Sequence, residues 1–332
     1  VPAMLGPPAP GYAPVARRVP DAAQPLHPAQ PESEPPPCGS RIVTAVVHDQ
    51  PGSGPLETAP NSPGAWATVK QALAGRELDF TSGPVGRAVV LLAIPMVLEM
   101  AMESLLALTD AFFVSRLGTD AVATVGLTEA MISLLYAVAI GAGMATTAMV
   151  ARRIGERDAE AAGIAAAQSM MLGLLMSLAV AVPGFLFAEE LLELMGGTPE
   201  LVASGHGYTR VLFGGSSTIM LIFLLNAVFR GAGDAAIAMR VLWIANLVNI
   251  VLDPCLIFGL GPFPEMGITG AAVATTIGRG VGVAIQLWLL FRGSDRIRVR
   301  WPDLVPRARL ILRLVRLSVG GVLQLLIGTT SW

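Results

Sequence analysis

Six apolar runs, each long enough to cross a lipid bilayer, follow one another through the middle of the chain. A transmembrane helix needs about 20 consecutive and mostly apolar residues. The hydrocarbon core offers no water to unpaired backbone groups, so runs of this kind form helices. The sequence therefore predicts an all-α integral membrane protein. The spans are expected at 86–114, 121–150, 163–187, 207–229, 239–259 and 268–291.

The composition supports a membrane protein and argues against a soluble domain and against a nucleic-acid-binding protein. Only 14% of the residues are charged, whereas soluble domains have about 25%. The net charge of −2 gives no basic field of the kind that attracts nucleic acid. Cys38 and Cys255 fit neither a disulfide framework nor a metal site. No nucleophile, zinc or phosphate-loop motif occurs, so we expect neither an enzyme nor a bound metal or organic cofactor.

Polar segments flank the apolar region. Residues 1–64 hold 16 of the 25 prolines and cannot bury a core, which predicts a disordered tail. Residues 65–85 form a polar lead-in with a weak amphipathic-helix pattern. An arginine-rich linker at 292–309 follows the sixth span, and a seventh apolar run occupies 310–332. This last run is similar to the first, which predicts an internal repeat with a truncated second copy.

The arginines between the spans predict the orientation of the protein. Loops on the cytoplasmic side of a membrane carry an excess of Lys and Arg. Eleven arginines lie in alternate loops, whereas the opposite loops hold Arg116 and otherwise acids. We therefore expect a multi-pass protein of the plasma membrane (a bacterial inner membrane) with its N-terminus in the cytoplasm. The eleven are Arg152, Arg153, Arg157, Arg230, Arg240, Arg292, Arg296, Arg298, Arg300, Arg307 and Arg309.

The fifth span carries three polar residues on one helical face. Asn246, Asn249 and Asp253 occupy positions i, i+3 and i+7. A carboxylate inside a span costs about 2.5–3.5 kcal/mol on insertion scales. A carboxylate that is retained inside a span more often has a function than not. We therefore expect the stripe to bind a cation, with a proton as the first candidate. The alternative is a hydrogen-bonded clamp between helices.

The first span supplies a second acidic face. Asp110 lies near its outer end, and Glu103 lies seven residues earlier on the same side. Two acids on one stripe argue against contact with lipid, although an acid near a span end can simply terminate the helix. Pro95 removes a backbone donor inside this span and predicts either a static kink or a hinge.

The start of the sixth span is rich in small residues. The segment 267–276 reads GITGAAVATT, a composition that allows close packing between membrane helices. Thr275 within it can add a hydroxyl to the polar site or serve packing alone.

Four stretches resemble the multidrug and toxic compound extrusion (MATE) transporters. They are LTDAFFVSRLG at 108–118, GAGMATTAMVARRIGERDAEAA at 141–162, FRGAGDA at 229–235 and NIVLDPCLIFGLGPFPEMGITGAAVAT at 249–275. The resemblance implies two six-helix lobes, of which this chain would hold the N-terminal lobe and the start of the seventh helix. It also implies a cation site at Asp110, Asn249, Asp253 and Thr275, with Pro95 as the bending proline. Ser115 departs from the usual glycine.

The resemblance implies export of cationic, amphiphilic small molecules against H⁺ or Na⁺, without a nucleic-acid partner. Glu103 and Asn246 would then be polar residues of the cavity. Three alternatives stay open: a lipid-linked oligosaccharide flippase of the same superfamily, a non-transporting remnant or scaffold, and pairing of two half-length chains as a homodimer. The spans carry few basic residues, Arg210 and Arg279 among them, which argues mildly against the flippase.

Overall fold

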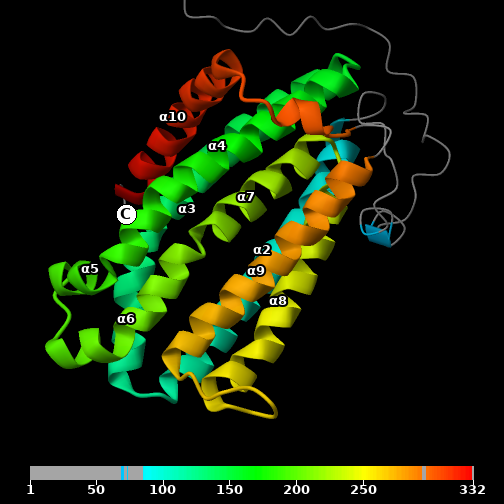
Figure 1. Cartoon of the computed structure of the whole chain (residues 1–332). Coiled ribbons are helices and arrows are strands. Elements are labelled where there is room, and N and C mark those ends of the chain that lie inside the picture. The colour runs from blue at the N-terminus through cyan, green and yellow to red at the C-terminus, as the bar shows by residue number, and fades with distance from the viewer. Residues whose placement is uncertain (1–68, 71–72, 74–84, 294–296, 331–332) are drawn as a thin grey trace, which may run out of the picture. The chain divides into compact units, whose positions relative to one another are not determined.

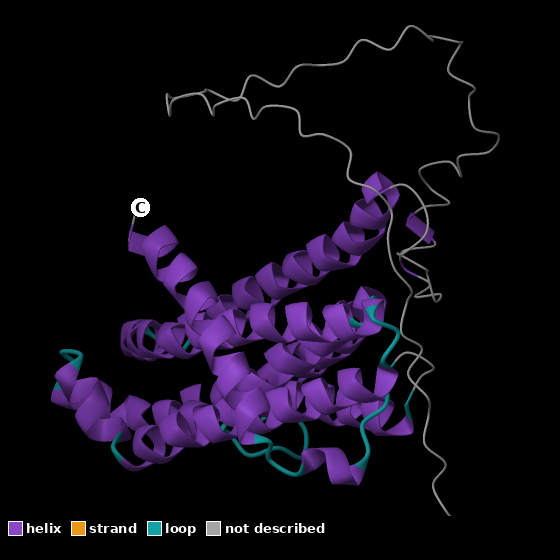
Figure 2. Ribbon diagram, turned by 90° about the horizontal axis from the view of Figure 1, so that it is seen from above, coloured by secondary structure: helices purple, strands orange, loops and turns teal. Residues whose placement is uncertain are grey.

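The computed structural model describes residues 69–70, 73, 85–293 and 297–330. The tail expected at 1–64 and almost all of the lead-in expected at 65–85 lie outside the described residues. Every regular element longer than a turn in the described part is a helix, and short loops connect the helices (Figure 2). The prediction of an all-α protein is therefore confirmed.

Within the described residues, six spans are long and apolar enough to cross a membrane. Figure 1 shows the helices that form them. Helices α6 and α7 together form one of them, and α10 follows the linker. The helices of the spans and α10 are α2 (Val85–Ser115), α3 (Thr119–Gly155), α4 (Ala159–Leu186), α6 (Pro199–Gly214), α7 (Ser216–Gly231), α8 (Ala235–Phe258), α9 (Ile268–Arg292) and α10 (Ala308–Thr330).

The fourth span differs from its predicted range of 207–229. It begins at Pro199, because the Thr198 hydroxyl accepts a hydrogen bond from the Leu201 amide and proline suits the first helical position. The helix is also interrupted at Gly215, where α6 ends and α7 begins. A short helix, α5 (Ala188–Leu194), lies in the preceding loop and has no apolar run that would have predicted it.

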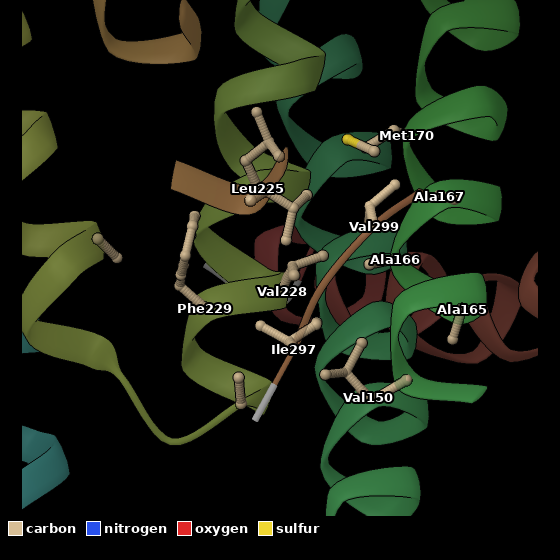
Figure 3. Close-up of a cluster of buried hydrophobic side chains, with 14 of the residues drawn as sticks. Val150, Ala165, Ala166, Ala167, Met170, Leu225, Val228, Phe229, Ile297 and Val299 are labelled. Atoms are coloured by element: carbon tan, nitrogen blue, oxygen red, sulfur yellow. The ribbon is translucent and has the colours of Figure 1, made fainter. Parts of the chain in front are cut away.

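The larger hydrophobic core forms where α3, α4 and α7 meet the linker. Ile297 and Val299 of the linker pack among side chains of α4 and α7 (Figure 3). The contact is close, since a Cβ atom at Gly163 of α4 would lie 2.2 Å from the Arg298 carbonyl oxygen. The segment after α9 is thus packed against the bundle, and it includes a short 3-10 helix, η1 (Trp301–Leu304).

A buried glutamine of α4 anchors the same linker. The Gln168 side-chain amide donates to the carbonyls of Asp303 and Val305, at 2.8 and 2.9 Å. Its oxygen accepts from the Arg307 amide at 2.7 Å. One side chain therefore satisfies three backbone groups of the segment that leads into α10.

Helices α8 and α9 pack closely because glycines of α9 face the backbone of α8. A Cβ atom at Gly278 would lie 2.7 Å from the Ala245 carbonyl oxygen, and one at Gly270 would lie 2.5 Å from that of Leu256. The expectation of close packing at the start of the sixth span is thus met by geometry. This approach brings the two helices near enough for their polar side chains to bond.

The substitution Gly278→Ala is expected to destabilise the protein by about 1–3 kcal/mol, because the added methyl group pushes α9 away from α8. The matched control is Gly280→Ala, since a Cβ atom there meets nothing within 4 Å. Thermal unfolding of the purified variants in detergent measures the effect. Equal midpoints for the two variants would contradict the packing argument.

The substitution Gln168→Ala is expected to loosen the linker, because three backbone groups lose their hydrogen-bond partner. Each of these groups that stays buried without a partner destabilises the folded linker by about 1–3 kcal/mol. Trypsin should then cleave at the linker arginines several-fold faster. Gln324→Ala on exposed α10 is the control. Unchanged cleavage would show that the Gln168 bonds do not hold the linker.

Candidate cation-binding site and cavity

The polar stripe of α8 faces the interior of the bundle. Asn246, Asn249 and Asp253 are each at most 4% exposed. They share one face because their spacing follows the helical period. Their side chains are therefore shielded from lipid, whereas the binding of a cation by this stripe stays a prediction.

Asn249 links Asp253 to α9. The amide orientation that satisfies both neighbours places its nitrogen 3.0 Å from each carboxylate oxygen of Asp253. Its oxygen then lies 3.1 Å from the Thr275 hydroxyl. That hydroxyl also lies 2.9 Å from the Ala271 carbonyl of its own helix. The structure thus joins Asn249, Asp253 and Thr275 in one network.

Asp110 of α2 completes the group of four predicted residues. Its side chain is in hydrogen-bonding contact with that of Asp253. A carboxylate only accepts hydrogen bonds, so two carboxyl groups can bond directly only when one of them carries a proton. The second oxygen of Asp110, Oδ1, is buried and has no partner among the described residues. A proton or another cation at this point would therefore satisfy groups that protein donors leave unpaired.

A cavity of about 660 Å³ opens beside the carboxyl pair. Asp110, Glu103, Asn246 and Thr275 all line it, so the two residues predicted as cavity polar groups are in place. Pro95 lies within α2, fifteen residues before Asp110, and does not line the cavity.

Further polar residues line the cavity without having been predicted as site residues, and three of them lie close to its charged groups or carry a charge themselves. These three are Glu129 and Tyr136 of α3 and Arg279 of α9, whose guanidinium donates to the Tyr136 hydroxyl at 2.8 Å; Ser115 and Tyr208 also line the cavity. Glu129 and Arg279 carry a visible signal, since each is a charged residue inside an apolar run. Together with Glu103 and Asp110 they give the lining three carboxyl groups and one guanidinium.

A second, more open hollow of about 900 Å³ lies between α3 and α10. Its polar lining consists of arginines, and it contains none of the predicted site residues. At its edge Glu156 is hydrogen-bonded to Arg152 and Arg153, at 2.8 Å each, which lowers the pKa of Glu156 below its usual range. This hollow marks the end of the bundle where α3, α7 and α9 terminate, which we call the arginine-rich end. Its lining arginines are Arg152, Arg153, Arg309, Arg313 and Arg316.

Comparison with known proteins agrees with this architecture. The MatE family model matches residues 95–255. The chain is 30% identical over 212 residues to the probable multidrug resistance protein NorM of Thermotoga maritima, covering 64% of this chain and 46% of that protein. It is 29% identical over 233 residues to the FAD transporter of Shewanella oneidensis, covering 67% and 52%.

Solved structures give the same result. An outward-facing multidrug resistance MATE transporter matches with a TM-score of 0.66 and 31% identity, covering 77% of this chain and 54% of that one. MATE structures described as bent and straight match with TM-scores of 0.66 and 0.67 and identities of 31% and 32%. They cover 78% and 74% of this chain and 55% and 54% of those chains. The chain spans about half the length of these relatives, and within that span it belongs to the MATE family of membrane transporters.

Proposed function

We propose that this chain forms the N-terminal lobe of a secondary transporter that exports small molecules in exchange for a cation. The cation would bind at Asp110, Asn249, Asp253 and Thr275. The observation that carries the proposal is the buried contact between the Asp110 and Asp253 carboxyl groups, together with the Asn249 amide on Asp253. Carboxylate and amide oxygens suit both H⁺ and Na⁺. The direct carboxyl contact favours H⁺.

The mechanism follows from the charge of this pair. Two unit charges about 4 Å apart repel by about 1–4 kcal/mol at effective dielectric constants between 80 and 20. A bound proton removes this repulsion and holds α2 against α8. Its release favours separation of the two helices. A cationic substrate in the adjacent cavity compensates the same charges, so substrate and proton oppose each other's binding, and this effect is reciprocal.

Helix α2 is suited to respond to the proton. Among the six spans it buries the smallest share of its apolar window. Pro95 also removes one helical hydrogen bond, which lowers the cost of bending. We propose that Pro95 is a hinge, and that rocking of two lobes provides alternating access to the cavity.

The cavity lining favours a cationic and amphiphilic substrate. Three carboxyl groups face one guanidinium, and Tyr136, Tyr208 and Phe223 supply aromatic surface. Aromatic faces and carboxylates together attract organic cations. The FAD transporter relative suggests an anionic nucleotide as an alternative substrate. Such a substrate would find one positively charged group in the cavity lining, that of Arg279. The same argument disfavours a lipid-linked oligosaccharide as the cargo.

We propose that the arginine-rich end lies in the cytoplasm, because positively charged loops stay on that side of a bacterial plasma membrane. The second lobe would come from further residues of the same polypeptide or from a second copy of this chain. If neither supplies it, the chain is a non-transporting scaffold.

The substitution Asp253→Asn in the full-length transporter should abolish efflux of a cationic dye, because the amide cannot take part in proton exchange with Asp110. Dye efflux from proteoliposomes with an imposed pH gradient measures this. Asp120→Asn, at the exposed start of α3, is the control for a generic loss of charge. Wild-type efflux in Asp253→Asn, with normal insertion, would refute the site.

The double substitution Glu103→Gln and Glu129→Gln should raise the dye KM by about 2- to 30-fold, since each partly exposed carboxylate contributes about 0.2–1 kcal/mol. Arg279→Gln should not raise it, because this residue repels a cation. The competition of FAD with the dye tests the anionic alternative. Inhibition by FAD that Arg279→Gln removes would contradict the cationic class.

A further inference from the structure

A second group of buried polar side chains joins α2, α7 and α9, closer to the arginine-rich end than the cavity site. Asn226 of α7 donates from its side-chain nitrogen to Glu99 Oε1 of α2, at 3.3 Å. Gln286 of α9 donates to the Asn226 side-chain oxygen. Arg230, one turn after Asn226, places a guanidinium nitrogen 3.6 Å from the same Glu99 oxygen.

Two acceptor atoms of this group have no donor. Glu99 Oε2 and Gln286 Oε1 are buried and lack a hydrogen-bond partner among the described residues. Glu99 is 6% exposed and Gln286 is fully buried. A buried acceptor without a partner costs about 1–3 kcal/mol, and native structures contain few of them. Because both atoms are acceptors, the missing component is a donor or a cation.

The surroundings of Glu99 favour a proton as that component. Oε1 already faces both Asn226 and the guanidinium of Arg230, while Oε2 faces no donor. A metal cation at this point would be repelled by Arg230. A proton on Oε2 turns the unpaired acceptor into a donor. It also neutralises the carboxylate, so no net positive charge is placed beside Arg230.

The charged groups that act on Glu99 are Arg230, from α7, and Glu103, one turn further along α2. On α8, Trp243 contributes only a neutral donor, which bonds to the Leu98 carbonyl at 3.3 Å. On α9, the side chain of this group is that of Gln286, which is neutral. Glu103 is in turn influenced by Arg279 of α9 and by Arg230.

Glu99 continues a line of acids along α2. Glu99, Glu103 and Asp110 lie at i, i+4 and i+11, which places them on one helical face. The line covers about 16 Å of helix rise. Glu103 and Asp110 line the cavity, so the line leads from the cation site towards the arginine-rich end.

We infer that Glu99 is a second proton-binding residue, through which protons pass between the Asp110–Asp253 pair and the arginine-rich end by way of Glu103. The inference rests on the proposed function of that pair. Glu103 and Asp110 are separated by about 10 Å of helix rise, so water in the cavity would carry the proton between them. In each step one carboxylic acid loses a proton and becomes a carboxylate, and one carboxylate gains that proton, so charge and atoms balance. Arg230 then serves as the counter-ion of ionised Glu99.

Infrared difference spectroscopy of the purified protein between acidic and alkaline pH tests this inference. Glu99→Gln should remove one protonated-carboxyl band from the wild-type spectrum. Asp253→Asn should remove a different band, which keeps the two sites distinguishable. Glu200→Gln, in the exposed first turn of α6, should leave both bands unchanged.

If Glu99→Gln fails to fold, Glu99→Asp keeps a carboxyl group in the same place, and the band should change in frequency while Asp253→Asn still removes only its own. A wild-type spectrum in Glu99→Gln, or an unshifted band in Glu99→Asp, would overturn the assignment of Glu99. If Asp253→Asn removes no band while Glu99→Gln removes one, the proposed cation site would be refuted and proton binding by Glu99 would stand.

Discussion

The contact between the Asp110 and Asp253 carboxyl groups is the interaction on which the proposed mechanism depends. Inside a bundle with few solvating groups, two ionised carboxylates repel each other, whereas one proton converts them into a hydrogen-bonded pair. The pair joins α2 to α8, and Asn249 and Thr275 extend the network to α9. In the proposed mechanism, a change in the occupancy of the cation site would therefore act on three helices at once.

These three helices differ in how firmly they are held. Glycines bring α9 against the backbone of α8, so Asn249, Asp253 and Thr275 lie on two closely packed helices. Helix α2 is the least buried span and contains Pro95. The proposed mechanism thus assigns the closely packed half of the site to α8 and α9 and the moving half to α2. Such an arrangement lets a small ligand bias a larger conformational equilibrium.

The spans and several of the site residues could be predicted from the sequence because both leave local patterns. Apolar runs revealed the six spans, and the i, i+3, i+7 spacing placed Asn246, Asn249 and Asp253 on the buried face. Other features have no local pattern. Glu99 meets Asn226 across 127 residues of chain, and Asn226 meets Gln286 across 60. The break at Gly215 differs from these, because it falls in the Gly-Gly-Ser-Ser stretch at 214–217, which the predicted span of 207–229 treated as continuous. The predicted tail at 1–64 lies outside the described residues.

Proton release on substrate binding tests the central claim most directly. Calorimetric titration of the full-length transporter with tetraphenylphosphonium, in buffers with different ionisation enthalpies, measures the protons exchanged per bound molecule. Coupling through the carboxyl pair predicts a net release of protons on binding, so the observed heat should vary with the buffer. Heat that is the same in every buffer would mean that substrate binding displaces no proton, and would contradict the account.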